Sequence, residues 1–480
     1  MVFNSFAFVL FFLVVFVVHN ILLKGLTKWQ NVFLLAASYF FYGYADLKML
    51  PLLAIATVLF YYLGIAVAEA KTDRANNVLS WIGISAGIGL LLYFKYLNFF
   101  IESFARLFES FGLQTNLHTF NIVMPLGISF FTFRLISYIV EIHRGVQDPT
   151  RDIVAFATYI SFFPCLLSGP IDRPDFMDQL QRKHEFDYGK AVDGARQVLW
   201  GLFKKCVVAD NCAHYVDEIW GSFGTMGGST LLLAAVMYSF QLYADFSGYS
   251  DMAIGVGKLL GFKITDNFRY PFFATNIAEF WRRWHISLTS WVTDYVFMPL
   301  NMMFRDMKQF GVILAIMINM LIVGMWHEAN WTCFFYGLYH GLLFVPLILT
   351  GSFNKRTKLE TTKLGLPKLG DLGKMLLTFA LVTLSFIIFR AENIGQAWGF
   401  LKGMFRADLF SLPFIIVGTK KSLFFAFVMI LTEWIFRKKA FALQFDDRFP
   451  RWASIGICYL VIGVILEFGA HSQSFVYFQF

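Results

Sequence analysis

Ten long apolar runs constrain this chain more than any other feature of its sequence. A helix needs about 20 mostly apolar residues to cross the hydrocarbon core of a bilayer. The runs cover residues 2–23, 32–44, 50–68, 78–97, 121–140, 313–326, 332–349, 375–389, 423–436 and 453–468. Three further stretches, residues 153–167, 195–208 and 230–260, are broken by proline, lysine or aspartate and predict short buried or re-entrant helices. The pattern predicts an all-α polytopic membrane protein with about 10–12 transmembrane helices.

The composition supports the same class. The chain has 480 residues, of which 58% are hydrophobic and 15% are charged, whereas soluble domains average about 45–50% and about 25%. So small a share of charged residues cannot provide the polar surface that a water-soluble multidomain enzyme needs. The first run continues without a small-residue cleavage site, so we expect a retained span rather than a signal peptide. We expect one membrane domain over residues 1–480.

Basic residues lie in the gaps between the apolar runs. The net charge is +8, and this distribution is typical of loops at an anionic cytoplasmic surface rather than of a nucleic-acid-binding protein. Several short loops are rich in lysine and arginine, and they fall on one side of the membrane if the spans alternate. These loops lie within residues 24–28, 71–74, 144–151, 354–374 and 437–451. The positive-inside rule makes that side cytoplasmic, although the basic residues within 402–421 then fall on the other side. We therefore expect both termini outside.

Three histidines, His285, His327 and His340, stand in apolar surroundings, where a buried polar side chain is costly and usually has a task. Histidine suits proton transfer near neutral pH because its unperturbed pKa is about 6.5. Two indoles, Trp326 and Trp331, flank His327 and would exclude water. From these residues alone, a structural role is as well supported as a catalytic one.

Familiar metal and nucleophile patterns are missing from the sequence. His327 and Glu328 begin the zinc motif H-E-x-x-H, but Trp331 stands where the second histidine is needed. The five cysteines form no C-x-x-C pair and are interpreted as buried apolar residues. There is no G-x-S-x-G elbow and no Walker A motif. The sequence predicts no metal site.

A second polar cluster interrupts one of the apolar stretches. It contains Tyr243, Asp245, Ser247 and Asp251. Its two carboxylates could form a proton path. They could also belong to a break between two short helices, with Ser247 and Asp251 as caps and Gly248 in the turn. Capping is the favoured interpretation.

Arg282 and Arg283 lie shortly before the first of the three histidines and are separated from it by Trp284. They could snorkel to the membrane surface or pair with lipid phosphates. Alternatively, one of them holds an anionic donor molecule or orients His285.

The order of these motifs along the chain is specific. Phe-Trp-Arg-Arg-Trp-His-Ile-Ser-Leu stands at residues 280–288, Trp-His at 326–327 and Tyr-His-Gly at 339–341. Supporting pieces stand at residues 125–131, 163–171, 243–251 and 475–480. The set resembles the membrane-bound O-acyltransferases, above all the alginate O-acetylase-type branch, with the D-alanine exporter of teichoic acid synthesis as a relative. The resemblance spans almost the whole chain, with core motifs at residues 121–345.

The resemblance implies a ring of helices around a thin centre that is crossed by a tunnel. It makes His327 the catalytic base, because the histidine of the family's Trp-His-Gly motif is the essential one, and His285 the second catalytic histidine. Here Glu328 replaces the family's glycine, and its carboxylate would hold the tautomer of His327 or point into a cytoplasmic funnel. Cys165 stands where relatives often have glutamine. The supporting residues would be His340, Asn330, Arg282, Trp326 and Glu328.

The resemblance also implies a reaction. His327 would take the proton of an acceptor hydroxyl and return it to the leaving thiolate, while His285 or Asn330 stabilises the oxyanion. The expected donor is acetyl-CoA, with an acyl carrier protein thioester as the alternative, and no bound cofactor is expected. The acceptor would be a surface polysaccharide or cell-wall polymer outside the bacterial inner membrane, reached with an exported acetyltransferase as partner protein.

A second hypothesis belongs to another class. A multi-pass transporter or flippase could use the intramembrane histidines and aspartates as a proton relay without acyl transfer. It lacks the paired repeats that many secondary transporters show.

Overall fold

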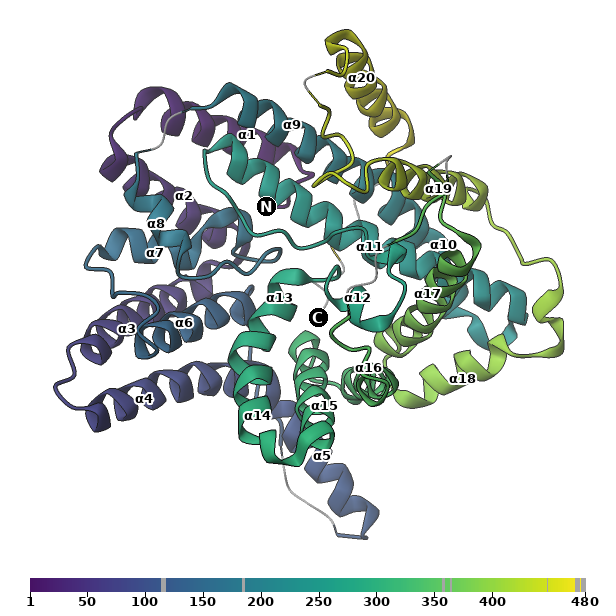
Figure 1. Ribbon diagram of the computed structural model, residues 1–480, viewed down its shortest axis with the longest axis horizontal. Helices are drawn as coiled ribbons and strands as arrows, with labels where there is room; N and C mark the ends of the chain where they lie inside the picture. The colour runs from purple at the N-terminus through teal and green to yellow at the C-terminus, as the bar shows by residue number, and fades with distance from the viewer. Residues whose placement is uncertain are drawn as a thin grey trace. The chain divides into compact units, whose positions relative to one another are not determined.

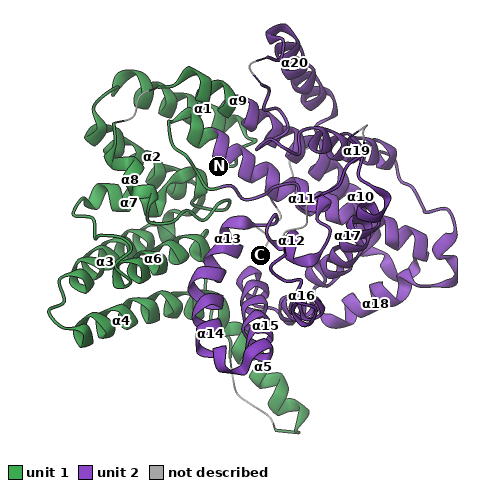
Figure 2. Cartoon of the chain, in the orientation of Figure 1, with its two compact units in different colours: residues 1–194, 256–265 green, residues 195–255, 266–480 purple. Residues whose placement is uncertain are grey.

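The computed structural model describes residues 1–113, 118–183, 186–355, 359–362, 365–446, 448–470 and 475. In those ranges the regular structure is helical and contains no β-strand. The predicted all-α architecture is therefore confirmed. Residues 476–480 of the family-like ending lie outside the described residues. The chain forms two compact units (Figure 2), the first from residues 1–194 and 256–265 and the second from residues 195–255 and 266–480.

The first unit consists of the N-terminal helices (Figure 1). They are α1 (Phe6–Val17), α2 (Thr27–Asp46), α3 (Leu50–Ala68), α4 (Asp73–Leu91), α5 (Leu97–Ser110), α6 (Ile128–His143), α7 (Ile153–Ser161), α8 (Phe176–Gln181) and the start of α9 (Tyr188–Leu202). Within this unit α6 packs against α3 and α4, and α2 packs against α7.

The second unit holds the remaining helices. They are the rest of α9, α10 (Asp210–Gly221), most of α11 (Gly228–Leu259), α12 (Ile277–Trp281), α13 (Ile286–Val292), α14 (Met298–Met303), α15 (Lys308–His327), α16 (Trp331–Leu349), α17 (Leu369–Arg390), α18 (Ile394–Met404), α19 (Thr419–Ile435) and α20 (Arg451–Phe468). A π-helical segment, Phe203–Ala209, joins α9 to α10.

Six segments of the described chain are long and apolar enough to cross a membrane. They are Thr27–Ala68, Asp73–Ser110, Arg305–His327, Trp331–Leu349, Leu369–Arg390 and Arg451–Phe468. The first two each contain two consecutive helices, α2 with α3 and α4 with α5. Fewer segments qualify than the predicted 10–12 transmembrane helices for two reasons. Two of the six segments each hold two helices, and several predicted runs form shorter helices: α6 has 16 residues and α19 has 17.

The buried Arg134 of α6 organises the turn that follows α7. Its Nη1 atom donates to the carbonyl oxygens of Tyr159 and Ile160 at 3.1 Å each, and its Nη2 atom donates to the carbonyl of Cys165 at 2.8 Å. The carbonyls at a helix end have no partner within the helix. A guanidinium, with five donors and a permanent charge, can satisfy several of them at once.

Helix α11 overturns the predicted break in the second polar cluster. It runs through 32 residues without interruption, so Ser247 and Asp251 lie inside a helix and cap nothing. Gly248 does not turn the chain but lets α11 approach α9, since an added Cβ would stand 2.9 Å from the carbonyl oxygen of Gly201. The break is unnecessary because Lys204, on the neighbouring helical segment, pairs with Asp251.

Helices α15 and α16 are neighbours (Figure 1) and form a hairpin. His327 is the last residue of α15, directly before the turn to α16. The two backbones touch at glycines: a Cβ on Gly324 would lie 2.2 Å from the carbonyl oxygen of Cys333, and one on Gly337 would lie 2.4 Å from that of Met320. Small residues at such a crossing let membrane helices pack closely. The crossing at Gly324 lies about one helical turn before His327. It therefore fixes the position of His327 along the axis of α15 relative to α16.

Gly324→Ala is expected to destabilise the protein by about 1–3 kcal/mol, because the new methyl group meets backbone atoms that cannot move aside. Gly456→Ala in α20 is the matched control, since nothing lies within 4 Å of its Cβ position and alanine is the better helix former by about 1 kcal/mol. In detergent, the thermal unfolding midpoint of Gly324→Ala should therefore fall below that of the wild type, whereas the midpoint of Gly456→Ala should not fall. Equal midpoints would show that the hairpin tolerates a wider crossing.

Candidate active site

The structure brings His285 and His327 together. Their side chains are buried, and their ring centres lie 6.1 Å apart. Trp326 packs 5.5 Å from the ring of His285, and Phe389 packs 5.2 Å from the ring of His327. Two imidazoles therefore share a space walled by aromatic rings, from which bulk water is largely excluded.

His285 has an unusual backbone conformation. It connects α12 to α13 with φ 46° and ψ 51°, in the left-handed region. The segment after α11 holds it there, because the carbonyl of Asn267 accepts from the Ile286 N–H at 2.8 Å and the carbonyl of Arg283 accepts from the Arg269 N–H at 2.9 Å. Backbone strain of this kind persists where surrounding contacts enforce it and clusters at functional sites.

The electrostatic surroundings favour a neutral His285. Burial, and secondarily the neighbouring His327, lowers the pKa of His285, which lies outside the candidate spans. Desolvation has this sign because it disfavours the charged imidazolium. At neutral pH the ring therefore carries one proton.

His340 occupies a closed hydrogen-bond network. The indole Nε1–H of Trp281 donates to His340 Nδ1 at 3.2 Å, so the ring proton belongs on Nε2, which donates to Ser385 Oγ at 3.0 Å. The Ser385 hydroxyl in turn donates to the carbonyl of Val382 at 2.6 Å. In a protonated His340, Nδ1 would also carry a hydrogen. That hydrogen would point at the indole N–H of Trp281, and this hydrogen bond would be lost. The residue thus ties together α12, α16 and α17.

The remaining candidates have distinct placements. Asn330 caps α16, its Oδ1 accepting from the Thr332 N–H and its Nδ2 donating to the carbonyl of Glu392, both at 3.2 Å. Arg282 is exposed and donates to the carbonyl of Phe353 at 3.0 Å. Glu328 is half-buried in extended backbone directly after α15.

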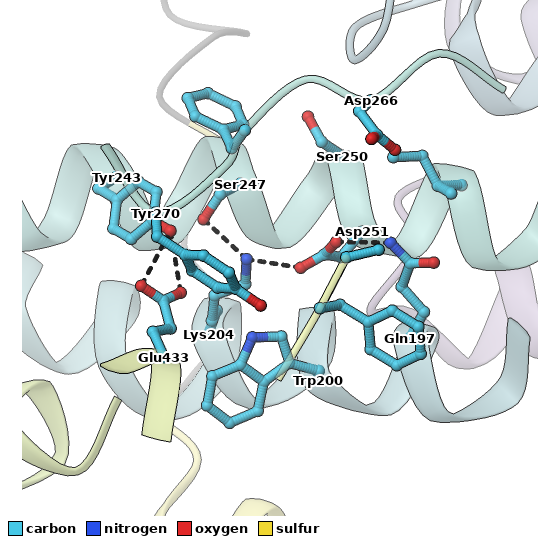
Figure 3. A pocket seen from close by; sticks show the side chains of 14 residues that line it. Gln197, Trp200, Lys204, Tyr243, Ser247, Ser250, Asp251, Asp266, Tyr270 and Glu433 are labelled. Carbon is cyan, nitrogen blue, oxygen red and sulfur yellow. Dashed lines mark hydrogen bonds and ion pairs between the residues drawn. The ribbon is translucent and has the colours of Figure 1, made fainter. Parts of the chain in front are cut away.

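The polar cluster of α11 is an ion-paired network (Figure 3). Lys204 Nζ pairs with Asp251 at 2.6 Å and donates to Ser247 Oγ at 2.9 Å, while Gln197 Nε2 donates to Asp251 at 2.8 Å. The hydroxyl of Tyr243 donates to the carboxylate of Glu433, whose oxygens lie 2.9 and 3.0 Å away. These side chains enclose a cavity of about 20 Å³, room for one water molecule.

A second lysine completes the network. Lys205 Nζ lies 2.8 Å from Asp210 and 2.7 Å from Asp245, and all three side chains are at most 3% exposed. The network borders the histidine pair, because Phe246 of α11 packs 4.7 Å from the ring of His285.

Sequence reasoning missed several members of this region. Glu433 stands inside an apolar run, so the rule that singled out the histidines could have found it. Asn267 and Ser385 carry no comparable signal, since one lies in a loop and serine is common in membrane helices. In the described chain, no group of three or more histidine, cysteine, aspartate or glutamate side chains could hold a metal ion.

A basic hollow of about 570 Å³ lies next to the small cavity in the second unit, since Tyr270 and Ala440 line both. Glu279 and Tyr270 contribute to its wall. Its cationic lining consists of Arg269, Arg282, Arg283, Arg437, Lys438 and Lys439. The excess of positive charge suits an anionic, phosphate-bearing molecule.

Comparison with known proteins agrees with the motif order. The model of the membrane-bound O-acyltransferase family matches residues 146–363. A protein of Azotobacter vinelandii named "Probable alginate O-acetylase AlgI" is 36% identical over 409 residues, covering 84% of this chain and 78% of its own length. A "Peptidoglycan O-acetyltransferase" of Helicobacter pylori is 32% identical, covering 84% and 80%. A "Teichoic acid D-alanyltransferase" of Streptococcus thermophilus is 29% identical, covering 73% and 93%.

These matches extend far beyond the short motifs and cover both units. The identity to the alginate-type relative exceeds 30% over most of both chains, and the helices have the length and apolarity of a multi-pass membrane protein. The chain belongs to the membrane-bound O-acyltransferase family and is an O-acyltransferase enzyme.

Proposed function

We propose that this protein takes an acetyl group from a cytoplasmic thioester and delivers it, through a tunnel in the membrane, for O-acetylation of an extracellular polysaccharide or cell-wall polymer. The observation that carries the proposal is the buried pair of His327 and His285, with ring centres 6.1 Å apart at the end of the α15–α16 hairpin. The names of the alginate- and peptidoglycan-type relatives support acetyl as the group and a glycan as the acceptor.

His327 acts as general base in the proposed reaction. One imidazole nitrogen takes the proton of the acceptor hydroxyl while the hydroxyl oxygen forms a bond to the thioester carbon. The tetrahedral oxyanion then collapses, the carbon–sulfur bond breaks, and the imidazolium returns its proton to the thiolate. Trp326 and Phe389 keep competing water away from the thioester.

The basic hollow supports a phosphate-bearing donor. Coenzyme A carries several phosphate groups, and the arginines and lysines of the hollow suit them. The loops that supply Arg437 to Lys439 belong to the side that the distribution of basic residues assigns to the cytoplasm. An acyl carrier protein, whose acyl arm also bears a phosphate, is the alternative donor. An exported acetyltransferase would complete transfer outside.

Inverted membrane vesicles can test this function. Acetyl-CoA labelled in the acetyl group is added outside, with alginate oligosaccharides or peptidoglycan fragments trapped inside. We expect label to reach the trapped glycan, and free coenzyme A thiol to appear, only in vesicles that contain the protein. Vesicles from cells lacking it are the control. Unchanged thioester in both preparations, also when a charged acyl carrier protein replaces acetyl-CoA, would contradict the proposal.

A transporter that relays protons through Asp245 and Asp251 has less support. Both carboxylates are buried against lysines, at 2.7 and 2.6 Å respectively. Each carboxylate is thus part of a buried ion pair, in which the two charges compensate each other and hold neighbouring helical segments together.

A further inference from the structure

We infer that Asn267 is a positioning residue that fixes the tautomer of His285, placing its proton on Nδ1 and leaving Nε2 as a hydrogen-bond acceptor. The inference rests on the proposed function, because it concerns the histidine pair of the same site. It adds a residue that no sequence motif marked, and it specifies which nitrogen of His285 faces the chemistry unprotonated.

The orientation of the Asn267 amide follows from its neighbours. Its side-chain oxygen lies 2.9 Å from Ser287 Oγ and 3.4 Å from the backbone nitrogen of Ser287, and its Nδ2 atom donates to Ser250 Oγ at 3.0 Å. A backbone N–H can only donate. Rotating the amide by 180° would set its NH₂ group against that N–H, so the oxygen must face Ser287.

The same oxygen then determines the state of His285. Asn267 Oδ1 lies 3.1 Å from His285 Nδ1. Since the amide oxygen can only accept, Nδ1 must carry a hydrogen and donate it. A neutral imidazole has one N–H, so Nε2 holds a lone pair. In that form His285 accepts a hydrogen bond from the acceptor hydroxyl or from His327, and it does not donate to an oxyanion.

The whole arrangement is sealed inside the second unit. Asn267, His285 and Ser287 are each fully buried. His285 packs against Phe246, Phe268 and Trp326, and the titratable group that faces it is His327. The backbone also contributes, because the carbonyl of Asn267 accepts from the N–H of Ile286. The backbone carbonyl of Asn267 thereby holds the main chain next to His285, and its side-chain oxygen determines which imidazole nitrogen of His285 carries the proton.

The amide keeps His285 apart from the acidic network. Ser250, which receives the Asn267 N–H, lines the small cavity beside Asp251 (Figure 3). An aspartate at position 267 would put a negative charge directly on the imidazole and favour the imidazolium. An amide provides the acceptor without the charge and so favours the neutral ring.

Two substitutions separate positioning from mere packing. Asn267→Leu removes the acceptor, so we expect kcat for acetyl transfer from labelled acetyl-CoA to fall about 10–100-fold, with KM for acetyl-CoA nearly unchanged. Asn267→Asp retains the acceptor and adds charge. Its activity should survive, but the acid side of its pH–rate profile should move to higher pH, since a neutral His285 is then reached only at higher pH. Asn77→Asp on the exposed face of α4 is the matched control for the charge change.

His285→Gln is measured alongside to separate the two ideas. If it abolishes transfer while both Asn267 variants keep the wild-type kcat and pH profile, the role of Asn267 is refuted and the catalytic histidine stands. If His285→Gln transfers acetyl at the wild-type rate, the catalytic role of His285 and the inference fail together. Thermal unfolding midpoints are recorded for every variant. If Asn267→Leu does not fold, the pH–rate profile of Asn267→Asp decides whether Asn267 positions His285.

Discussion

Replacing His327 with glutamine is expected to lower the rate of acyl transfer by about 10²–10⁴-fold, which is the usual contribution of a positioned general base. Glutamine is preferred to alanine because His327 packs against Phe389 and Tyr336, and a truncated side chain would leave a cavity between those rings. Glutamine fills much of the space and can hydrogen-bond, but it cannot take up a proton at neutral pH. The measurement is the release of coenzyme A thiol per molecule of folded protein.

A histidine elsewhere supplies the control. His143 lies exposed at the end of α6, so His143→Gln makes the same chemical change without touching the buried pair. We expect its rate and its pH dependence to match the wild type. Wild-type turnover in a folded His327→Gln protein would remove the base from the mechanism and leave His327 as a packing residue.

Much of the fold and part of the site could be predicted from local sequence. Apolar runs reveal membrane helices because the bilayer imposes both length and polarity on them. The motif order identified His285 and His327 as candidates, although they are 42 positions apart in the sequence, and the structure places them side by side.

Non-local pairing explains what could not be predicted. Asp245 and Asp251 suggested a broken helix because a local pattern contains no sign of the lysines that pair with them, which lie 40 and 47 residues earlier in the chain. The left-handed backbone of His285 depends on hydrogen bonds to the Asn267 segment. The closed network of His340 likewise requires Ser385, which lies on a later helix.

Lys205→Met should be the most destabilising of the substitutions considered. It leaves Asp210 and Asp245 as two buried carboxylates without their shared cation. Removing one partner of a buried ion pair typically costs about 3–5 kcal/mol, because the remaining charge stays out of water uncompensated. Methionine fills nearly the same volume as the lysine stem, so lost packing contributes little. The thermal unfolding midpoint of the detergent-solubilised protein measures the effect.

The matched control is an ion pair on the surface. Arg151 and Glu69 lie 2.7 Å apart, yet their side chains are 77% and 56% exposed. Pairs of that kind contribute about 0–1 kcal/mol, so Arg151→Ala should leave the midpoint almost unchanged. Similar losses in both variants would mean that burial of the Lys205 network adds nothing to its strength.

Neutralising the two carboxylates should reverse most of the loss. In Lys205→Met combined with Asp210→Asn and Asp245→Asn, the buried charges are gone together, and replacing a whole buried ionic group is often nearly neutral for stability. Lower pH should narrow the deficit of the single Lys205→Met variant for the same reason, because protonation removes the uncompensated charges. A triple variant as unstable as the single one would show that the two uncompensated carboxylates do not cause the loss. The other contacts of the lysine would then account for it, among them the cation–π contact of its Nζ, 4.2 Å from the centre of the Phe475 ring.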